Sequence, residues 1–168
     1  NLETDSLRLG QEFFKALKHI EIFRGLEREQ ILNIVNLCKL INLHEGQVLF
    51  QEGADSDSMI MVTSGSLKVE SNGNVLAKVM PSGVVGEMGV FTNQKRSADV
   101  IALVKTQALY LPKDRLMKMV EKDLEAGLII YKNVVVILSK YLRENNFKLE
   151  LNSMLDEIDL DDDDIDLS

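Results

Sequence analysis

The stretch at residues 85–99 holds the side chains that are best suited to chemistry. Gly86 lets the backbone approach a ligand closely or adopt a positive φ. Glu87 can accept two hydrogen bonds from a diol, and the rigid fork of Arg96, together with the hydroxyl and N–H of Ser97, can hold a phosphate. This combination suits a sugar-phosphate. The residues alone leave one alternative open, an ordinary Glu–Arg ion pair in a surface loop.

Other chemistries have less support. A metal-dependent enzyme built on a small β-roll needs a cluster of histidines and carboxylates that project inward. The sequence has only two histidines, and we expect His19 on a helix and His44 in a turn. It also lacks a nucleophile–base pair and a phosphate loop of the nucleotide-hydrolase kind. We therefore expect a protein that is not an enzyme, with no catalytic residues, no metal site and no cofactor.

The composition is that of an ordinary soluble globular protein, with 45% apolar and 27% charged residues among 168. We expect one domain with extensions and, since no run of about 18 apolar residues occurs, no membrane insertion. The single cysteine, Cys38, excludes an internal disulfide and fits a reducing compartment, so we expect a cytoplasmic protein. Because Asn1 is not preceded by a methionine or an apolar signal segment, the chain is expected to be processed or cut from a longer protein.

The net charge of −8 is concentrated at one end of the chain. Residues 156–168 carry eight acidic side chains and no basic one; removing these eight from the total of 27 leaves 19 acidic residues against 19 basic ones. A nearly neutral body with an acidic end is a poor electrostatic match for nucleic acid or for an anionic membrane. DNA binding is therefore not supported.

Three segments must position the residues at 85–99. Residues 1–40 are predicted to be helical, because apolar residues recur at three- and four-residue spacing on both sides of Gly25. Residues 41–112 contain seven short apolar or alternating runs separated by turn signals, which indicates an antiparallel roll or sandwich. Asn72-Gly73 predicts a hairpin between two of these runs. The runs are 48–50, 59–63, 66–70, 75–80, 84–85, 98–103 and 108–111.

Residues 113–151 are predicted to form helices, the second of which runs from about Asp123 to about Leu149. Its apolar residues fall into two stripes. The first stripe is a heptad seam, which favours pairing with a second copy of the helix, whereas the second faces another direction and can pack on the roll. Residues 152–168 are rich in aspartate and are expected to be disordered. The seam comprises Leu124, Leu128, Tyr131, Val135, Leu138, Leu142, Asn145 and Leu149, and the second stripe comprises Ile130, Val134, Ile137 and Tyr141.

Together these features resemble the cyclic nucleotide-binding domain, the sensor module of catabolite-activator-type regulators, protein kinase A regulatory subunits and cyclic-nucleotide-gated channels. The resemblance covers about residues 13–150. It implies a mainly β fold: an antiparallel, jelly-roll-like β-roll (a double-stranded β-helix) with N-terminal helices and a long C-terminal helix. It rests on Gly86-Glu87-Met88-Gly89 and Arg96-Ser97-Ala98, which are similar to the family's phosphate-binding cassette, and on residues 45–53 and 61–69, which are similar to its roll signature.

The resemblance also implies a role for each site residue. Arg96 and Ser97 would bind the cyclic phosphate, together with the backbone N–H at Met88. Gly86 and Glu87 would contact the ribose. The same resemblance, with less specific matches, places the purine against Asn145 and Asn146; plausible apolar walls, for which core packing is equally expected, are Val69, Leu76, Val84 and Val85.

The expected function is therefore that of a sensor that binds cAMP, with cGMP as the alternative, and changes a dimer or partner contact through its C-terminal helix. A degenerate roll that acts only as a dimerisation or interaction module is the competing expectation. Asn145, the polar member of the seam, could set the register of a homodimer or face the ligand. The long helix runs into the acidic segment instead of a DNA-binding helix-turn-helix, so the effector stays unidentified.

Overall fold

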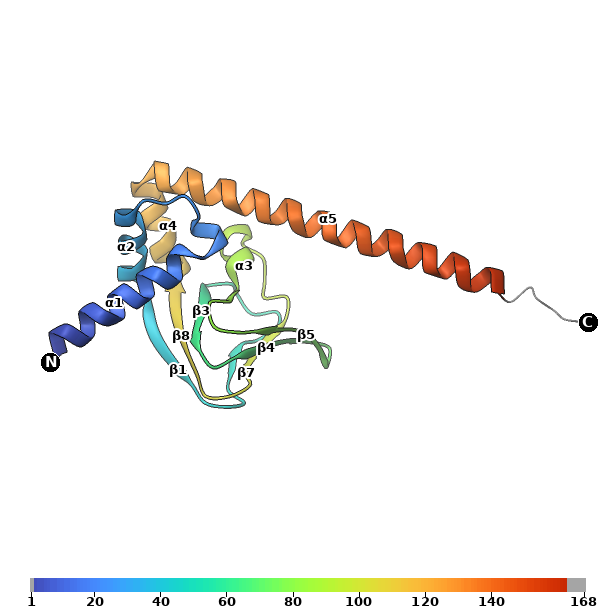
Figure 1. Cartoon of the computed structure of the whole chain (residues 1–168), viewed down its shortest axis with the longest axis horizontal. Coiled ribbons are helices and arrows are strands. Elements are labelled where there is room, and N and C mark those ends of the chain that lie inside the picture. Colours follow the sequence, from blue (N-terminus) through green and yellow to red (C-terminus); the bar gives the residue numbers. More distant parts are fainter. Residues whose placement is uncertain (1, 163–168) are drawn as a thin grey trace, which may run out of the picture.

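The computed structural model describes the chain from residue 2 to residue 162, with side-chain surroundings for residues 10–153. Two four-stranded sheets form a roll, and helices from both ends of the chain gather on one side of it (Figure 1). The helices are α1 (Leu2–Lys18), η1 (Glu21–Phe23), α2 (Arg28–Leu37), α3 (Glu87–Thr92), α4 (Lys113–Lys122) and α5 (Leu124–Asp162). The strands are β1 (Lys39–Leu43), β2 (Val48–Phe50), β3 (Ser58–Ser64), β4 (Leu67–Ser71), β5 (Asn74–Val79), β6 (Val84–Val85), β7 (Asp99–Ala102) and β8 (Thr106–Pro112).

Every strand pairing in the two sheets is antiparallel. One sheet has the order β1-β8-β3-β6 and the other has the order β2-β7-β4-β5. The β4–β5 turn has Asn72 at φ 52° and Gly73 at φ 75°, with Ser71 paired to Asn74. Positive φ at both central residues is the requirement of a type I′ hairpin turn, which asparagine and glycine meet at little cost. The expected fold class is confirmed.

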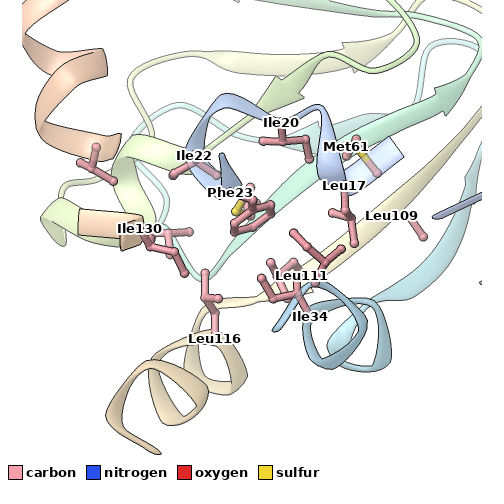
Figure 2. Packing of buried hydrophobic residues seen from close by; sticks show 14 of the residues in the cluster. Leu17, Ile20, Ile22, Phe23, Ile34, Met61, Leu109, Leu111, Leu116 and Ile130 are labelled. Atoms are coloured by element: carbon pink, nitrogen blue, oxygen red, sulfur yellow. The ribbon is translucent and has the colours of Figure 1, made fainter. Parts of the chain in front are cut away.

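The core has two parts, which share strands β3 and β8. Successive side chains of a strand point to opposite faces of the sheet, and in β3 both faces are buried. Ile60 and Val62 pack between the two sheets, whereas Met59 and Met61 pack against the helices. Figure 2 shows the helical side of this core, where Phe23 of η1 lies among side chains from α2, β8, α4 and α5. The helices are therefore attached to the roll by apolar burial.

Strand β1 was not expected from the sequence, which predicted helix as far as residue 40. Helix α2 ends at Leu37, and Cys38 adopts an extended conformation with its N–H bonded to the carbonyl of Val35. Residues 39–43 then pair along their whole length with β8. Pairing with a distant strand has overridden the local helical pattern, and this kind of tertiary effect is invisible to periodicity.

Helix α5 packs on the body through the second apolar stripe. Ile130, Val134 and Ile137 are buried in the helical part of the core. The side-chain amide of Asn133 donates to the carbonyl oxygens of Ile22 (3.0 Å) and Arg24 (2.8 Å), which fixes η1 to this helix. The apolar members of the seam, in contrast, have exposed fractions from 37% to 76%, although Tyr131 also contacts the Phe91 ring of α3 edge to face. No helix within residues 2–162 is long and apolar enough to cross a membrane.

The end of α5 departs from the sequence prediction. Disorder was expected from residue 152, but the helix continues to Asp162; residues 163–168 lie outside the part that the structure describes. No glycine or proline follows Gly127 in this range. Without such a residue, nothing in the backbone chemistry ends the helix, even though aspartate is a weak helix former.

The two apolar faces of α5 give a test of the packing. Replacing the fully buried Ile130 with alanine should lower the free energy of unfolding by about 2–5 kcal/mol, because it removes buried methylene groups and leaves a cavity. Val136 lies on the same helix, is 58% exposed and is outside the seam, so Val136→Ala should cost less than about 1 kcal/mol. Urea unfolding followed by circular dichroism measures both, and equal losses would contradict the packing of α5 described above.

Candidate functional site

The loop around Arg96 is attached to the turn after β2. The N–H of Arg96 donates to the carbonyl of Ala54 and the N–H of Gly53 donates to the carbonyl of Arg96, both at 2.8 Å. Lys95 forms an ion pair with Asp55 in the same turn. These bonds hold two segments side by side that are about 40 residues apart in the sequence, and they direct the Arg96 side chain into the roll.

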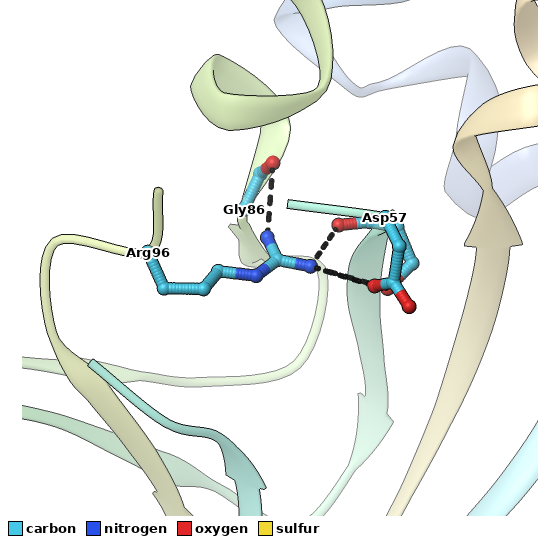
Figure 3. A network of polar contacts seen from close by, with 4 residues as sticks. Asp57, Gly86 and Arg96 are labelled. Atoms are coloured by element: carbon cyan, nitrogen blue, oxygen red, sulfur yellow. Dashed lines mark hydrogen bonds and ion pairs between the residues drawn. The ribbon is translucent and has the colours of Figure 1, made fainter. Parts of the chain in front are cut away.

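The guanidinium of Arg96 is buried and oriented by several oxygens. Its Nη2 donates to the carbonyl (2.7 Å) and hydroxyl (3.2 Å) of Ser58 and to Oδ1 of Asp57 (3.3 Å), and Nη1 lies 3.5 Å from the carbonyl of Gly86 (Figure 3). Its Cζ lies 3.5 Å from the centre of the Phe50 ring, a cation–π contact. Burial lowers the pKa of the Arg96 guanidinium, and the Asp57 carboxylate opposes that shift. The group stays charged, because arginine ordinarily titrates far above neutral pH.

Two buried side-chain atoms in this region have no hydrogen-bond partner. Among the described residues these atoms are Nε of Arg96 and the hydroxyl oxygen of Ser56. The Ser56 side chain lies against the backbone of Gly89 so closely that a Cβ at Gly89 would collide with it. A buried polar group that lacks a partner is costly. The cassette therefore retains hydrogen-bonding capacity at the point where α3 meets the Arg96 loop.

Gly86 has the conformation that the sequence suggested. Its φ is 82°, in the left-handed region, and it directly precedes α3. A Cβ at this position would also collide with Nη1 of Arg96 and would crowd the Phe50 ring. Glycine is thus required here both by backbone angle and by the close approach of the arginine.

Glu87 is separated from Arg96 in its interactions. The ion pairs of the described residues join Arg96 to Asp57, and none joins it to Glu87. The alternative of a simple Glu87–Arg96 pair is therefore wrong. Glu87 instead lines a cavity of about 200 Å³ together with Val84 and, from α5, Tyr141.

Burial in this cavity raises the pKa of the Glu87 carboxyl. The pKa of Tyr141 is also raised, first by burial and then by the negative charges of Glu87 and Glu21. Burial is the first cause of both shifts, because it disfavours the charged form of each group. The carboxylate of Glu87 is thus poorly solvated and faces α5.

The remaining predicted residues are spread over the roll and α5. Met88 is half-buried in the first turn of α3, and Ser97 is exposed. Val69 and Val85 belong to the core between the sheets, whereas Leu76 is 62% exposed on β5.

Asn145 and Asn146 are exposed on α5. Asn145 follows Tyr141 by four residues, so the two lie on neighbouring positions of one helix face. The structure does not bring either asparagine into contact with the cassette, and their role stays a prediction.

Four residues of the arginine pocket were missed by the sequence reasoning, namely Phe50, Ser56, Asp57 and Ser58. They follow one another closely from the end of β2 to the start of β3. The available signal was the turn at residues 51–57, which separates two apolar runs and carries glycine, serine and aspartate. Nothing in that stretch indicated that it would lie against a loop 40 residues further along.

Comparison with known proteins identifies the family of this roll. The family model described as "Cyclic nucleotide-binding domain" matches residues 40–123, which is half of the chain. The chain belongs to this family. Arg96, Glu87 and Gly86 all lie within the part of the chain that matches the family.

Relatives of known name come from several kinds of regulator. The chain is 30% identical over 125 residues to the cGMP-dependent protein kinase egl-4 of Caenorhabditis briggsae. This match covers 74% of this chain and 16% of the kinase. It is 23% identical over 140 residues to the CRP-like cAMP-activated global transcriptional regulator of Mycobacterium tuberculosis, covering 80% of this chain and 61% of the regulator. The chain thus spans less than two thirds of the length of these relatives.

A solved structure gives a closer match in size. The N-terminal domain of a transcriptional regulator from Streptomyces coelicolor A3(2) has a TM-score of 0.68 and 28% sequence identity to this chain, and the match covers 74% of this chain and 93% of that one. The shared part is thus nearly the whole of that domain. The chain is homologous to the sensor domains of regulators, and that family is typically regulatory rather than catalytic.

The desolvated carboxylate leads to a test by pH. Because the folded-state pKa of Glu87 is raised, its ionisation opposes folding. The resulting loss of stability grows as the pH rises from the unfolded-state pKa to the folded-state pKa. Glu87→Gln removes the charge at similar volume, so it should raise the ligand-free melting temperature at pH 7 and leave it nearly unchanged near pH 4. Thermal unfolding at both pH values measures this. The quantity to compare is the melting temperature of Glu87→Gln minus that of the native chain. A difference that is lower at pH 7 than at pH 4 would contradict the burial of this charge.

Proposed function

We propose that this protein is a non-catalytic sensor domain that binds a 3′,5′-cyclic nucleotide in the cassette at residues 85–99. The observation that carries the proposal is the buried guanidinium of Arg96, which is fixed by Ser58 and Asp57 and still has an unpartnered Nε donor. A cyclic phosphate carries one negative charge and several acceptor oxygens, so it can take the donors that the protein leaves unused. Exposed Ser97 and the backbone at Met88 supply further donors at the edge of the cassette.

In this proposal Glu87 binds the ribose. Its carboxylate is poorly solvated and lies in a cavity, so donor hydroxyl groups on a ligand relieve the burial that raises its pKa. A ribose 2′-hydroxyl next to the cyclic phosphate has the required position, because Gly86 joins the two contacts without a side chain of its own. The carboxylate and the guanidinium then act on neighbouring parts of one ligand.

The preferred ligand is cAMP, with cGMP as the alternative. The cAMP-activated regulator aligns over a large part of this chain and favours cAMP, whereas the cGMP-dependent kinase supports the alternative. The amide groups of Asn145 and Asn146 can both donate and accept hydrogen bonds, so they do not choose between adenine and guanine. The ligand class therefore rests on the cassette, and the base has to be measured.

Signal output is assigned to α5. Ile137 and Tyr141 of this helix line the same cavity as Glu87, so a ligand at Glu87 changes the surroundings of α5 directly. The exposed seam on another face of the helix is suited to a homodimer or to an effector, which the chain leaves unidentified. A ligand shifts such a contact only by its differential affinity for the two arrangements. A cytoplasmic location is part of this proposal, on the basis of the single unpaired cysteine.

A second candidate function is an interaction module that has lost its ligand. The observation in its favour is the length and exposure of the seam, since seven apolar side chains of α5 face solvent along it. This candidate predicts pairing of α5 that does not depend on any nucleotide.

Calorimetry separates the two candidates. Titration of the full chain with cAMP and with cGMP should give saturable heat with one of them at micromolar protein, together with a rise in melting temperature at excess ligand. AMP, which lacks the cyclic ester, is the matched control and should bind at least tenfold more weakly. Absence of heat and of a thermal shift with both cyclic nucleotides, at protein concentrations well above micromolar, would reject the sensor and favour the interaction module.

Variants of the phosphate contacts locate the ligand. Arg96→Lys keeps the positive charge but loses the fork of donors, and it should weaken binding by about 2 kcal/mol, the size of one charged hydrogen bond. Ser97→Ala alters an exposed residue and should weaken binding by about 1 kcal/mol without changing stability. Lys105→Ala, an exposed change elsewhere on the roll, is the control. Calorimetry gives the affinities and thermal unfolding verifies the fold; unchanged affinity in a folded Arg96→Lys chain would place the phosphate elsewhere.

A further inference from the structure

A large groove of about 770 Å³ lies between α1 and α2, outside the cassette and its cavity. Its apolar lining includes Phe14 and Leu32, and its cationic lining consists of Lys15, Lys18 and Arg28. None of the described residues that line it is acidic, and no ion pair among the described residues uses these three cations. Arg28 lies 5.1 Å from the centre of the Phe14 ring. The groove is thus apolar with a positively charged rim, which suits an acidic segment that also carries apolar side chains.

This chain contains such a segment. Residues 155–168 hold eight acidic residues and no basic one, and their apolar residues are distributed among the acids. The acidic segment, as residues 155–168 are called below, therefore has both properties that the groove requires. Its apolar members are Leu155, Ile158, Leu160, Ile165 and Leu167.

The acidic segment cannot occupy the groove of its own chain while α5 is intact. At 1.5 Å per residue, the 39-residue helix is roughly 58 Å long. It begins beside α2 and α4 and ends far from the body, so its last turn and α1 lie at opposite ends of the molecule (Figure 1). The occupant with matching chemistry is the acidic segment of a second copy.

The seam of α5 allows two orientations for that copy. Its spacing of 4-3-4-3-4-3-4 reads the same in both directions, so antiparallel pairing places Leu124 opposite Leu149 and Val135 opposite Leu138. Parallel pairing would place the two acidic segments together, and like charges at that density repel. Antiparallel pairing separates them and places Asn145 opposite Leu128, in a layer near the end of the seam, where a polar residue costs least.

Antiparallel pairing also carries each acidic segment to the groove end of the other copy. The residues beyond 149 extend past the start of the other α5, and that end of the molecule is where α1, α2 and α4 gather (Figure 1). A second groove there, between α2 and α4, is lined by Arg115, Lys118 and Lys122 and by one acidic residue, Asp123. Its net charge adds to the positive charge at that end of the molecule. Charge and apolar pattern thus favour the same orientation.

We propose that two copies pair antiparallel along the α5 seam and that the acidic segment of each docks in the α1–α2 groove of the other. The proposal rests on the pairing of α5 in the proposed function and does not require nucleotide binding. It assigns a role to the acidic end of the chain and to a groove that the cassette does not use.

Cross-linking tests the orientation. One chain carries Leu124→Cys and a second, differently tagged chain carries Leu149→Cys; both positions are exposed, at 76% and 67%. Native Cys38 is a weak competitor, because burial raises the pKa of its thiol to about 12 and thiolate is the reactive form. Under mild oxidation the mixed dimer should become linked by a disulfide, whereas Leu149→Cys alone should not. A Leu149→Cys homodimer, or a chain that sediments as a monomer, would overturn the proposal.

Charge reversal tests the groove. Lys15→Glu with Lys18→Glu should weaken the dimer about tenfold in sedimentation equilibrium at low salt, and adding Asp161→Lys with Asp163→Lys should restore most of the affinity. Lys78→Glu with Lys105→Glu is the control, with the same charge change at exposed roll positions, and should leave the dimer unchanged. A groove variant that behaves like this control would reject the docking.

The two proposals fail separately in these experiments. A chain that cross-links antiparallel but shows no heat with either cyclic nucleotide would contradict the sensor and support the dimer. Binding heat with a cyclic nucleotide, together with a disulfide-linked Leu149→Cys homodimer, would support the sensor and contradict the antiparallel dimer.

Discussion

The arrangement of the site depends on the burial of one charge, the guanidinium of Arg96. An unpaired buried charge is costly, so the surrounding segments have to supply oxygens and an aromatic face. They come from the end of β2, the start of β3 and the residue before α3, and the bonds to Ser58 and Gly86 together with the contact to Phe50 tie them to one point. Most of these oxygens belong to the backbone or to a hydroxyl, and the single carboxylate, Asp57, is itself exposed. The positive charge is therefore oriented without being fully neutralised.

The negative charge of Glu87 is likewise kept from direct neutralisation. Glu87 is held one residue after Gly86, yet it faces α5 and the cavity and not the arginine. A direct bond between the two groups would satisfy both in the empty protein, and a ligand would have to break it before binding to either. Kept apart, each retains a demand for partners that a molecule with a phosphate and a diol can meet.

Much of this fold could be predicted from the sequence, because local signals and tertiary structure agree over most of the chain. Alternating apolar runs, the Asn72-Gly73 turn and the buried stripe of α5 all correspond to elements of the structure. Strand β1 could not be predicted, since residues 39–43 become a strand by pairing with β8 across a long stretch of sequence. The oxygens around Arg96 were missed for a similar reason: Asp57 and Ser58 acquire their role through the bonds that join two turns. In the acidic part of α5, composition predicted disorder, whereas the absence of a helix-breaking residue was the better indicator up to Asp162.

The uninterrupted course of α5 also has a mechanical consequence. The helix is clamped to the body at Ile130, Val134 and Ile137, and beyond Tyr141 its residues are exposed as far as their surroundings are described. A stiff rod that is held near one end acts as a lever. From Tyr141 to Asp162 the helix rises by roughly 31 Å, so a tilt of about 10° at the clamp displaces its far end by roughly 5 Å. A change in cavity volume too small to alter the fold of the roll can in this way become a displacement of the size of one helical turn.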